Sequence, residues 1–338
     1  MREIILNFPK QFRVGFERVP KLTVKKPLRG VCICGMGGSA LPGSILYSWI
    51  NTKKIDLPVI VNRDYSLPYR IKKGWLVVCI SYSGNTEETL SCFKEALKNK
   101  LTVVSIGSGG KLETLSKKHR VPFIKIPSGI PPRTAIGYQF GALVGILKNC
   151  GIFSKKDVQE LLALENINAR NLENYGKNLS KKIVKKIPII YASNKFKIAA
   201  RIWKIAFNEN TKIPAFWNYF PELNHNEMTG FTKYKIQNST LPAGRQECKI
   251  AIQNSKFYFI ILKDRNDYKR IKKRMDLTAK ILKNQGVKGE IIDIKGKNFL
   301  EKVFSSIILG FWTSYYLAKH YNIDPIPVKL VEELKKRI

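Results

Sequence analysis

The chain has 338 residues, of which 44% are apolar and 11% aromatic. Such a composition can bury a full core in two medium-sized domains, and it excludes a disordered or fibrous protein. The 60 basic and 25 acidic residues give a formal net charge of +35, which favours anionic ligands. No uncharged apolar run approaches the roughly 18 residues of a membrane helix, and the first residues lack the signal-peptide pattern, so neither feature is expected.

The basic residues are spread along the whole chain, for example at Lys117-Lys118, Lys155-Lys156 and Lys272-Lys273. They do not interleave with aromatic residues in one segment, as they would in a typical nucleic-acid-binding surface. We therefore interpret the charge as a solvated basic surface and expect no specific nucleic-acid partner.

The cysteines and histidines are few and scattered. Six cysteines form no Cys-x-x-Cys pair and no framework of a small secreted domain, so we expect reduced thiols in a cytoplasmic protein. Three histidines, far apart in the sequence, do not predict a metal site.

From residue 29 to 150, short apolar runs alternate with amphipathic segments, which predicts a parallel sheet covered by helices. We expect strands at 31–34, 59–61, 75–80, 102–106 and 123–126. Helices are expected at about 40–50, from the end of SYSGNTEE to 98, at 111–119 and at 138–148. A rigid proline loop, 127–132, precedes the last of these helices.

The second half repeats this plan weakly. Strands are expected at 188–192, 257–262 and 290–294, and helices at 197–208, from 267 to about 284, and at 299–321. The shared order predicts two similar α/β domains, 1–150 and 151–338, joined by a polar helical stretch at 154–182. The polar segment 238–247 reads as an exposed turn, and we assign it no function.

Two turns that follow predicted strands carry residues suited to an anion. Ligands of open parallel sheets bind at the carboxyl ends of the strands, where glycines admit backbone amides and a helix N-terminus favours a dianion. The candidate phosphate-binding residues are Gly37, Gly38 and Ser39 in the first turn, and Ser81, Ser83 and Thr86 in the second.

A simpler interpretation of the second turn is that Ser83 or Thr86 only caps the following helix, a contribution of about 1 kcal/mol. Three hydroxyls in six residues, beside a second glycine-rich turn, favour a phosphate site. Neither turn has the spacing of a dinucleotide fingerprint or of a nucleotide P-loop, so no nucleotide is expected.

Five segments give the chain a family resemblance. GMGGSA at 35–40, SYSGNTEET at 81–89, PPRTAIGY at 131–138, FNEN at 207–210 and PELNHNE at 221–227 occur here in this order. Together they resemble the bifunctional phosphoglucose/phosphomannose isomerases, which are built from two sugar-isomerase (SIS) domains. The resemblance spans essentially the whole chain. It implies two SIS-type domains, each a mainly parallel sheet flanked by helices in three α/β/α layers.

The resemblance also implies catalytic roles. Glu209 falls at the family's catalytic base, which moves a proton between C1 and C2 of the open sugar through a cis-enediol. His225 resembles the histidine that helps to open the sugar ring and reaches into the partner subunit's site. Glu222 and Glu227 both remain candidates to orient it.

Two cations complete the implied set. Arg133 matches the arginine that stabilises the developing enediolate. Lys335 resembles the C-terminal lysine that assists ring opening, although its neighbour Lys336 is an open alternative.

The resemblance implies an enzyme of carbohydrate metabolism that interconverts glucose 6-phosphate, and mannose 6-phosphate, with fructose 6-phosphate. It implies a homodimer that needs neither metal nor cofactor. Two alternatives stay open. One is a non-catalytic SIS protein that senses a sugar phosphate, and the other is an SIS isomerase for another sugar phosphate.

Overall fold

The computed structural model describes residues 1–22, 27–232 and 254–337. It divides into two compact units: unit 1 is Met1–Tyr175 with Gly296–Trp312, and unit 2 is Gly176–Lys295 with Thr313–Ile338. Neither unit is continuous in the sequence, and the domain limits 1–150 and 151–338 stay a prediction. The segment 238–247 lies outside the described residues.

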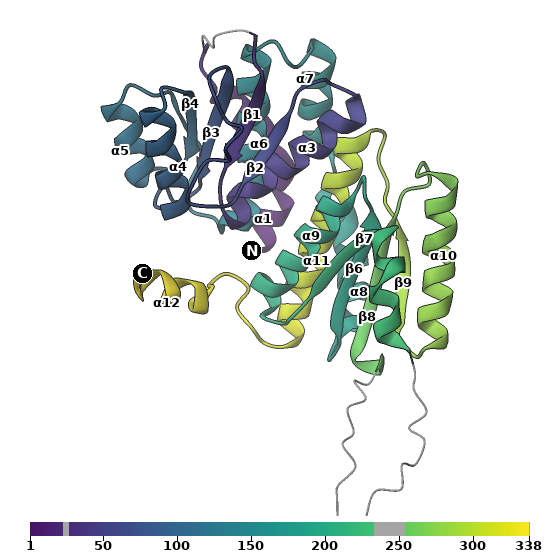
Figure 1. The fold of residues 1–338 in the computed structure, drawn as a ribbon. Helices are drawn as coiled ribbons and strands as arrows, with labels where there is room; N and C mark the ends of the chain where they lie inside the picture. Colours follow the sequence, from purple (N-terminus) through teal and green to yellow (C-terminus); the bar gives the residue numbers. More distant parts are fainter. Residues whose placement is uncertain (23–26, 233–253, 338) are drawn as a thin grey trace, which may run out of the picture. The chain divides into compact units, whose positions relative to one another are not determined.

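The described residues of unit 1 form a five-stranded parallel sheet in the order β2-β1-β3-β4-β5 (Figure 1). Its central strands are buried along their whole length, as expected for a parallel sheet with both faces covered. The strands are β1 (Gly30–Cys34), β2 (Val59–Asn62), β3 (Trp75–Ser81), β4 (Thr102–Gly107) and β5 (Phe123–Lys125).

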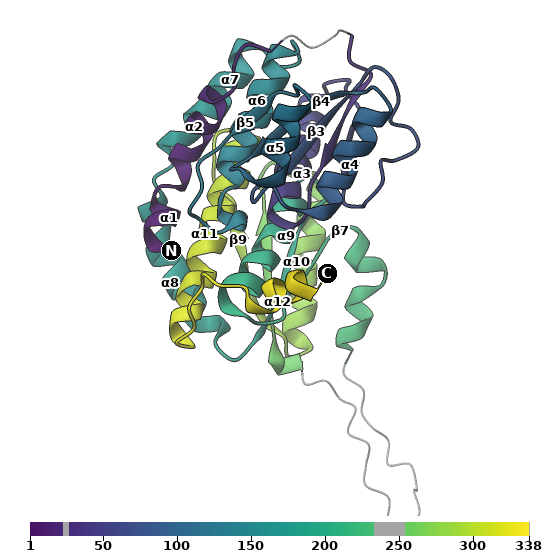
Figure 2. The ribbon, with the colours of Figure 1, turned by 90° about the vertical axis from the view of Figure 1, so that its left-hand side faces the viewer.

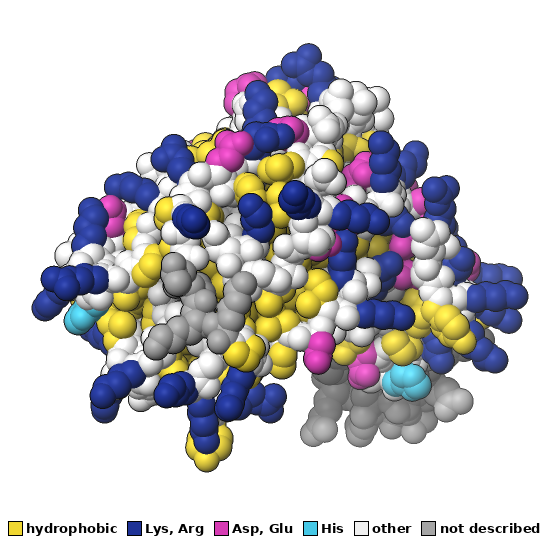
Figure 3. Space-filling model, turned by 90° about the horizontal axis from the view of Figure 1, so that it is seen from above, with side chains coloured by type: hydrophobic (Ala, Val, Ile, Leu, Met, Phe, Trp, Pro, Cys, Tyr) yellow, Lys and Arg dark blue, Asp and Glu magenta, His cyan; other side chains and the backbone are white. Residues whose placement is uncertain are grey.

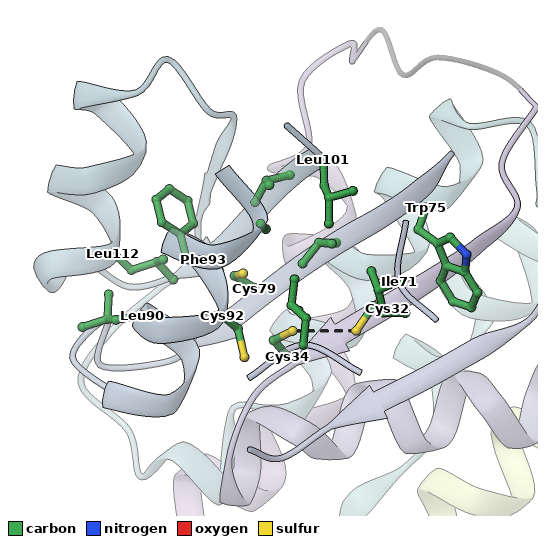
Figure 4. Packing of buried hydrophobic residues seen from close by; sticks show 14 residues of the cluster. Cys32, Cys34, Ile71, Trp75, Cys79, Leu90, Cys92, Phe93, Leu101 and Leu112 are labelled. Atoms are coloured by element: carbon green, nitrogen blue, oxygen red, sulfur yellow. Dashed lines mark hydrogen bonds between the residues drawn. The ribbon is translucent and has the colours of Figure 1, made fainter. Parts of the chain in front are cut away.

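Helices cover both faces of this sheet. On one face, α4 and α5 pack over the core drawn in Figure 4. On the other face, Gly43 of α3 lies against Ile33, and Trp49 of α3 meets Phe140 of α6. Helices α2 and α6 run side by side (Figure 2). The helices are α1 (Arg2–Leu6), α2 (Gln11–Glu17), α3 (Leu41–Lys53), α4 (Glu87–Lys98), α5 (Gly110–Lys118), α6 (Ile136–Asn149) and α7 (Lys155–Leu162).

The core under α4 contains four buried thiols (Figure 4). The Sγ atoms of Cys32 and Cys34 lie 3.8 Å apart, and Cys79 is the register partner of Cys34 on β3. Cys92 of α4 donates a hydrogen bond of 3.2 Å to the carbonyl oxygen of Asp64. These side chains are free thiols that pack as small apolar groups.

The described residues of unit 2 form a four-stranded parallel sheet in the order β7-β6-β8-β9. The order matches β2-β1-β3-β4 of unit 1, as the predicted duplication requires. Strand β7 was not expected from the sequence. The strands are β6 (Ile187–Ser193), β7 (Phe216–Phe220), β8 (Phe257–Lys263) and β9 (Lys288–Asp293).

In unit 2, helix α10 covers one face of the sheet and α9 packs on β6 and β7. The helices are α8 (Glu173–Ile183), α9 (Lys197–Ala206), α10 (Lys269–Asn284), α11 (Phe299–His320) and α12 (Lys329–Arg337), of which α8 and α11 contribute to both units. Among the residues that the structure describes, no helix is long and apolar enough to cross a membrane.

Candidate active site

The turn after β3 is organised around the hydroxyl of Ser81, a side chain that is 0% exposed. Its Oγ accepts hydrogen bonds from the backbone N–H of Gly84 (3.1 Å) and of Thr86 (3.4 Å), and it lies 2.9 Å from Oγ1 of Thr86. Either hydroxyl can donate in this last contact.

Helix α4 begins without a side-chain cap. Thr86 occupies the N-cap position in an extended conformation, but its hydroxyl makes no bond to the first amides of the helix. Those amides and the helix dipole favour an anion at this end. The capping interpretation of Thr86 therefore does not hold, and the geometry suits a phosphate.

Gly84 fixes the shape of this turn. Its φ of +72° lies in the left-handed region, and a Cβ at this position would be 1.7 Å from the carbonyl oxygen of Gly109. The carbonyl of Gly84 also accepts a bond of 2.9 Å from the N–H of Leu112. Only glycine fits here, because the turn packs directly on the loop that follows β4.

The turn after β1 is hydrogen-bonded to the turn after β3. The Oγ of Ser39 accepts bonds from the N–H of Tyr82 (3.1 Å) and from Nε2 of Gln139 (3.3 Å), so this serine links three segments. A Cβ on Gly38 would lie 2.8 Å from the carbonyl oxygen of Pro132. Gly37 has open space at its Cβ position, which leaves its backbone accessible to a ligand.

Arg133 lies in the short 3-10 helix Pro132–Thr134, and its side chain is only 1% exposed. Its backbone adjoins Gly38. The hydroxyl of Tyr82 accepts a bond of 3.2 Å from the N–H of Ile130, and burial raises the pKa of this tyrosine. The structure thus brings all the predicted residues of unit 1 together at the carboxyl edge of one sheet.

In unit 2, Glu209 lies in a single π-helical turn, Phe207–Thr211, that extends α9. Such turns occur frequently at functional sites. Asn210 Nδ2 donates to Oγ of Ser314 (2.8 Å) and Thr211 Oγ1 donates to the carbonyl of Ser314 (3.0 Å), which anchors the turn on α11. Glu209 itself directly precedes these two anchored residues and is half-buried.

His225 ends the short 3-10 helix Glu222–His225 after β7, and its side chain is exposed. The two candidate orienting carboxylates bond elsewhere. Glu222 accepts from Asn226 (3.1 Å), and Glu227 accepts from the hydroxyl of Tyr191 (2.6 Å) and from Asn218 (2.5 Å). Within the described residues, the histidine side chain therefore projects without an orienting carboxylate.

Lys335 is exposed on helix α12. The side chain of Lys336 is outside the described set, so the choice between the two lysines stays a prediction. The apolar side chains of Leu330 and Leu334 on the same helix are also exposed.

Four supporting residues were missed from the sequence: Tyr82, Gln139, Tyr191 and Asn218. Tyr191 and Asn218 are register partners on β6 and β7, and both donate to Glu227, which holds the PELNHNE segment against the sheet. Burial and the neighbouring Glu227 carboxylate raise the pKa of Tyr191. The sequence signal that could have revealed Asn218 is its position as a polar residue inside the aromatic run FWNYF.

Two further observations concern possible metal ligands and the distribution of basic side chains. Across residues 1–22, 27–232 and 254–337, no cluster of three or more His, Cys, Asp or Glu side chains is placed to hold a metal ion. Lysine and arginine side chains are scattered over the face drawn in Figure 3 rather than gathered in one stripe.

Comparison with known proteins identifies the family. Residues 172–338 match the family described as bacterial phospho-glucose isomerase C-terminal SIS domain. The chain is 33% identical over 314 residues to the bifunctional phosphoglucose/phosphomannose isomerase of Aquifex aeolicus, across 92% of this chain and 91% of that protein. It is 29% identical over 313 residues to a D-glucosamine-6-phosphate 4-epimerase of Sulfolobus acidocaldarius, across 92% and 90%.

Among solved structures, the C-terminal domain of glucosamine-fructose-6-phosphate aminotransferase from Francisella tularensis is similar in fold. It has a TM-score of 0.71 at 16% identity, across 96% of this chain and 97% of that one. The predicted SIS fold, with parallel sheets flanked by helices, is confirmed. The chain belongs to the bifunctional phosphoglucose/phosphomannose isomerase family.

Proposed function

We propose that the protein interconverts glucose 6-phosphate and mannose 6-phosphate with fructose 6-phosphate through a cis-enediol. One observation of the site carries the proposal: in a chain of this family, helix α4 begins at SYSGNTEE without a side-chain cap on the amides of its first turn. A phosphate dianion is the ligand that such a turn accepts best.

The phosphate is the part of the substrate that binds the turns of unit 1 and does not react. Gly37, Ser83 and Thr86 contact it directly, whereas Ser39 and Ser81 act mainly by holding the two turns in place. Binding energy from this non-reacting end positions the sugar carbons for proton transfer.

Proton transfer is assigned to Glu209, because one carboxylate can take a proton from C2 and return it to C1 on the same face. Arg133 stabilises the negative charge that develops on the enediolate oxygen. His225 passes a proton to the ring oxygen during ring opening, a step suited to an imidazole, and Lys335 assists it. None of these steps requires a metal or a nucleotide.

The exposed position of His225 supports a homodimer in which this side chain serves the partner subunit's site. A cytoplasmic location fits the free thiols of the core, which persist in a reducing compartment.

The activity is tested with the purified full chain in excess chelator, supplied separately with glucose 6-phosphate and mannose 6-phosphate. Formation of fructose 6-phosphate from both, followed by NMR, is the expected result. Turnover that needs added metal, or no turnover of either sugar, would contradict the proposal.

A second candidate comes from the similarity to the Sulfolobus acidocaldarius protein, which is named a D-glucosamine-6-phosphate 4-epimerase. The same assay with glucosamine 6-phosphate discriminates between the two. Epimerisation of the amino sugar without isomerisation of glucose 6-phosphate would favour this second candidate.

A further inference from the structure

Unit 2 contains a hollow of about 560 Å³ that the catalytic proposal does not use. It lies at the carboxyl ends of β8 and β9 and beside the first turns of α10, which runs along β9 in Figure 1. Its lining residues are Lys263, Arg265, Lys269, Lys272, Lys273, Asp276, Leu277 and Asp293. All of them belong to unit 2, whereas the proposed phosphate turns belong to unit 1.

The lysines that α10 contributes to the hollow are spaced so that they lie on one face of the helix. Lys269, Lys272, Lys273 and Asp276 follow one another at helical positions i, i+3, i+4 and i+7, so they share one face of α10. Lys263 and Asp293 are the last residues of β8 and β9 and are register partners in the sheet. The floor of the hollow is therefore the sheet edge, and one wall is a lysine face of a helix.

Internal contacts leave this hollow positively charged. Five basic side chains face two carboxylates. Lys263 Nζ lies 2.6 Å from Oδ1 of Asp276, so this pair is neutral as a unit. Lys272 Nζ donates to the carbonyl oxygen of Arg265 (2.7 Å), which holds the lysine across the hollow while its charge is kept. Together the lining carries an excess of three positive charges.

We propose that this hollow binds a small anion with two linked phosphate groups, of the pyrophosphate type. A volume of this size falls in the range of small-molecule pockets, and the carboxyl edge of a parallel sheet is where such ligands bind. One phosphate group carries about 1.5–2 negative charges at pH 7, so two linked groups suit a lining with an excess of several positive charges. A guanidinium and several ammonium groups are the donors that phosphate oxygens use.

The comparison with unit 1 supports this. There the turn after β3 packs directly on the turn after β4, because Gly84 contacts Gly109. In unit 2 the hollow is lined by Arg265, from the turn after β8, and by Asp293, the last residue of β9.

The test measures binding of inorganic pyrophosphate to the intact protein by calorimetry at fixed ionic strength. The double variant Lys269→Gln/Lys273→Gln removes two exposed lysines of the hollow. Its matched control is Lys283→Gln/Lys288→Gln, which removes two exposed lysines from another hollow of unit 2, at the amino ends of β8 and β9. Both variants lose the same charge, so a general field effect would act on them equally.

We expect the first variant to bind pyrophosphate at least about ten-fold more weakly and the control to change less than about two-fold. Equal weakening in both variants, or no binding by the wild type, would overturn the proposal. Binding that persists in both variants would also overturn it, because the anion would then occupy another site, such as the turns of unit 1.

A second experiment tests whether the hollow binds nucleic acid instead of a small anion. A 20-residue oligonucleotide is titrated over a range of salt concentrations, since such binding falls steeply with salt. If the oligonucleotide binds through Lys269 and Lys273 while pyrophosphate does not bind, the small-anion proposal is wrong. Isomerase activity is measured in parallel, and we expect both double variants to retain it, which separates this proposal from the catalytic one.

Discussion

The hydroxyl oxygens of Ser81 and Thr86 lie 2.9 Å apart at the end of β3, and this contact keeps the Thr86 hydroxyl from capping helix α4. A buried serine thus orients a more exposed threonine. Ser81 organises the turn through the amides of Gly84 and Thr86, and helix α4 is left without a side-chain cap.

Replacing Thr86 by alanine should weaken phosphate binding without disturbing proton transfer. A hydrogen bond to a charged group is worth about 1.5–3 kcal/mol, so KM for the sugar phosphates should rise about 10–100-fold with little change in kcat. Steady-state kinetics measure this, with Thr114→Ala on the exposed side of α5 as the control. An unchanged KM would remove Thr86 from the phosphate site.

Gly84→Ala should destabilise the fold strongly, because the new Cβ meets the carbonyl oxygen of Gly109 at 1.7 Å. We expect a loss of about 3 kcal/mol or more in the free energy of unfolding. Gly129→Ala is the matched control: its φ is also positive, but nothing lies within 4 Å, so only about 1–2 kcal/mol of backbone strain is expected. Denaturant unfolding gives both values, and equal losses would show that the contact with Gly109 is unimportant.

Asp267 should make stability depend on pH. Burial, followed by the neighbouring Asp264 carboxylate, raises the pKa of Asp267 above its ordinary value of 3.8, and the side chain is 8% exposed. The neutral form is favoured in the folded state. Its contribution is therefore complete below pH 3.8 and is lost as the pH rises through the raised value.

Asp267→Asn, which stays neutral, should be more stable than the wild type at pH 7, and the difference should vanish as the pH falls toward 4. Urea unfolding at several pH values measures this, with the exposed Asp56→Asn as control. A difference that is constant with pH would contradict the assigned cause.

Much of the fold could be predicted from the sequence. Eight of the strands were expected within one or two residues of their observed bounds, because long apolar runs and the turns after them are local signals. Strand β7 was missed, since its run FWNYF is interrupted by a polar residue. Its place in the sheet depends on pairing with β6, which no local pattern reveals.

The sequence names the candidate site residues, and the family resemblance implies their roles, which stay predictions; the contacts that hold these residues in place could not be predicted. The sequence could not show that Ser39 accepts from Tyr82 and Gln139, because these contacts join segments up to 100 residues apart. Nor could it show the π-helical turn at Glu209, which depends on contacts with Ser314, about a hundred residues later. Residue types in a motif indicate the candidates, whereas contacts between distant segments determine how those residues are placed.

The most direct test of the catalytic assignment is the turnover of glucose 6-phosphate by Glu209→Gln. The matched control is Glu290→Gln, a carboxylate of the same unit that pairs with Lys182. Loss of a general base lowers rates by about 10²–10⁴-fold, so kcat of the Glu209 variant should fall by that factor while KM changes little and the control stays active. Full activity of Glu209→Gln would contradict the account.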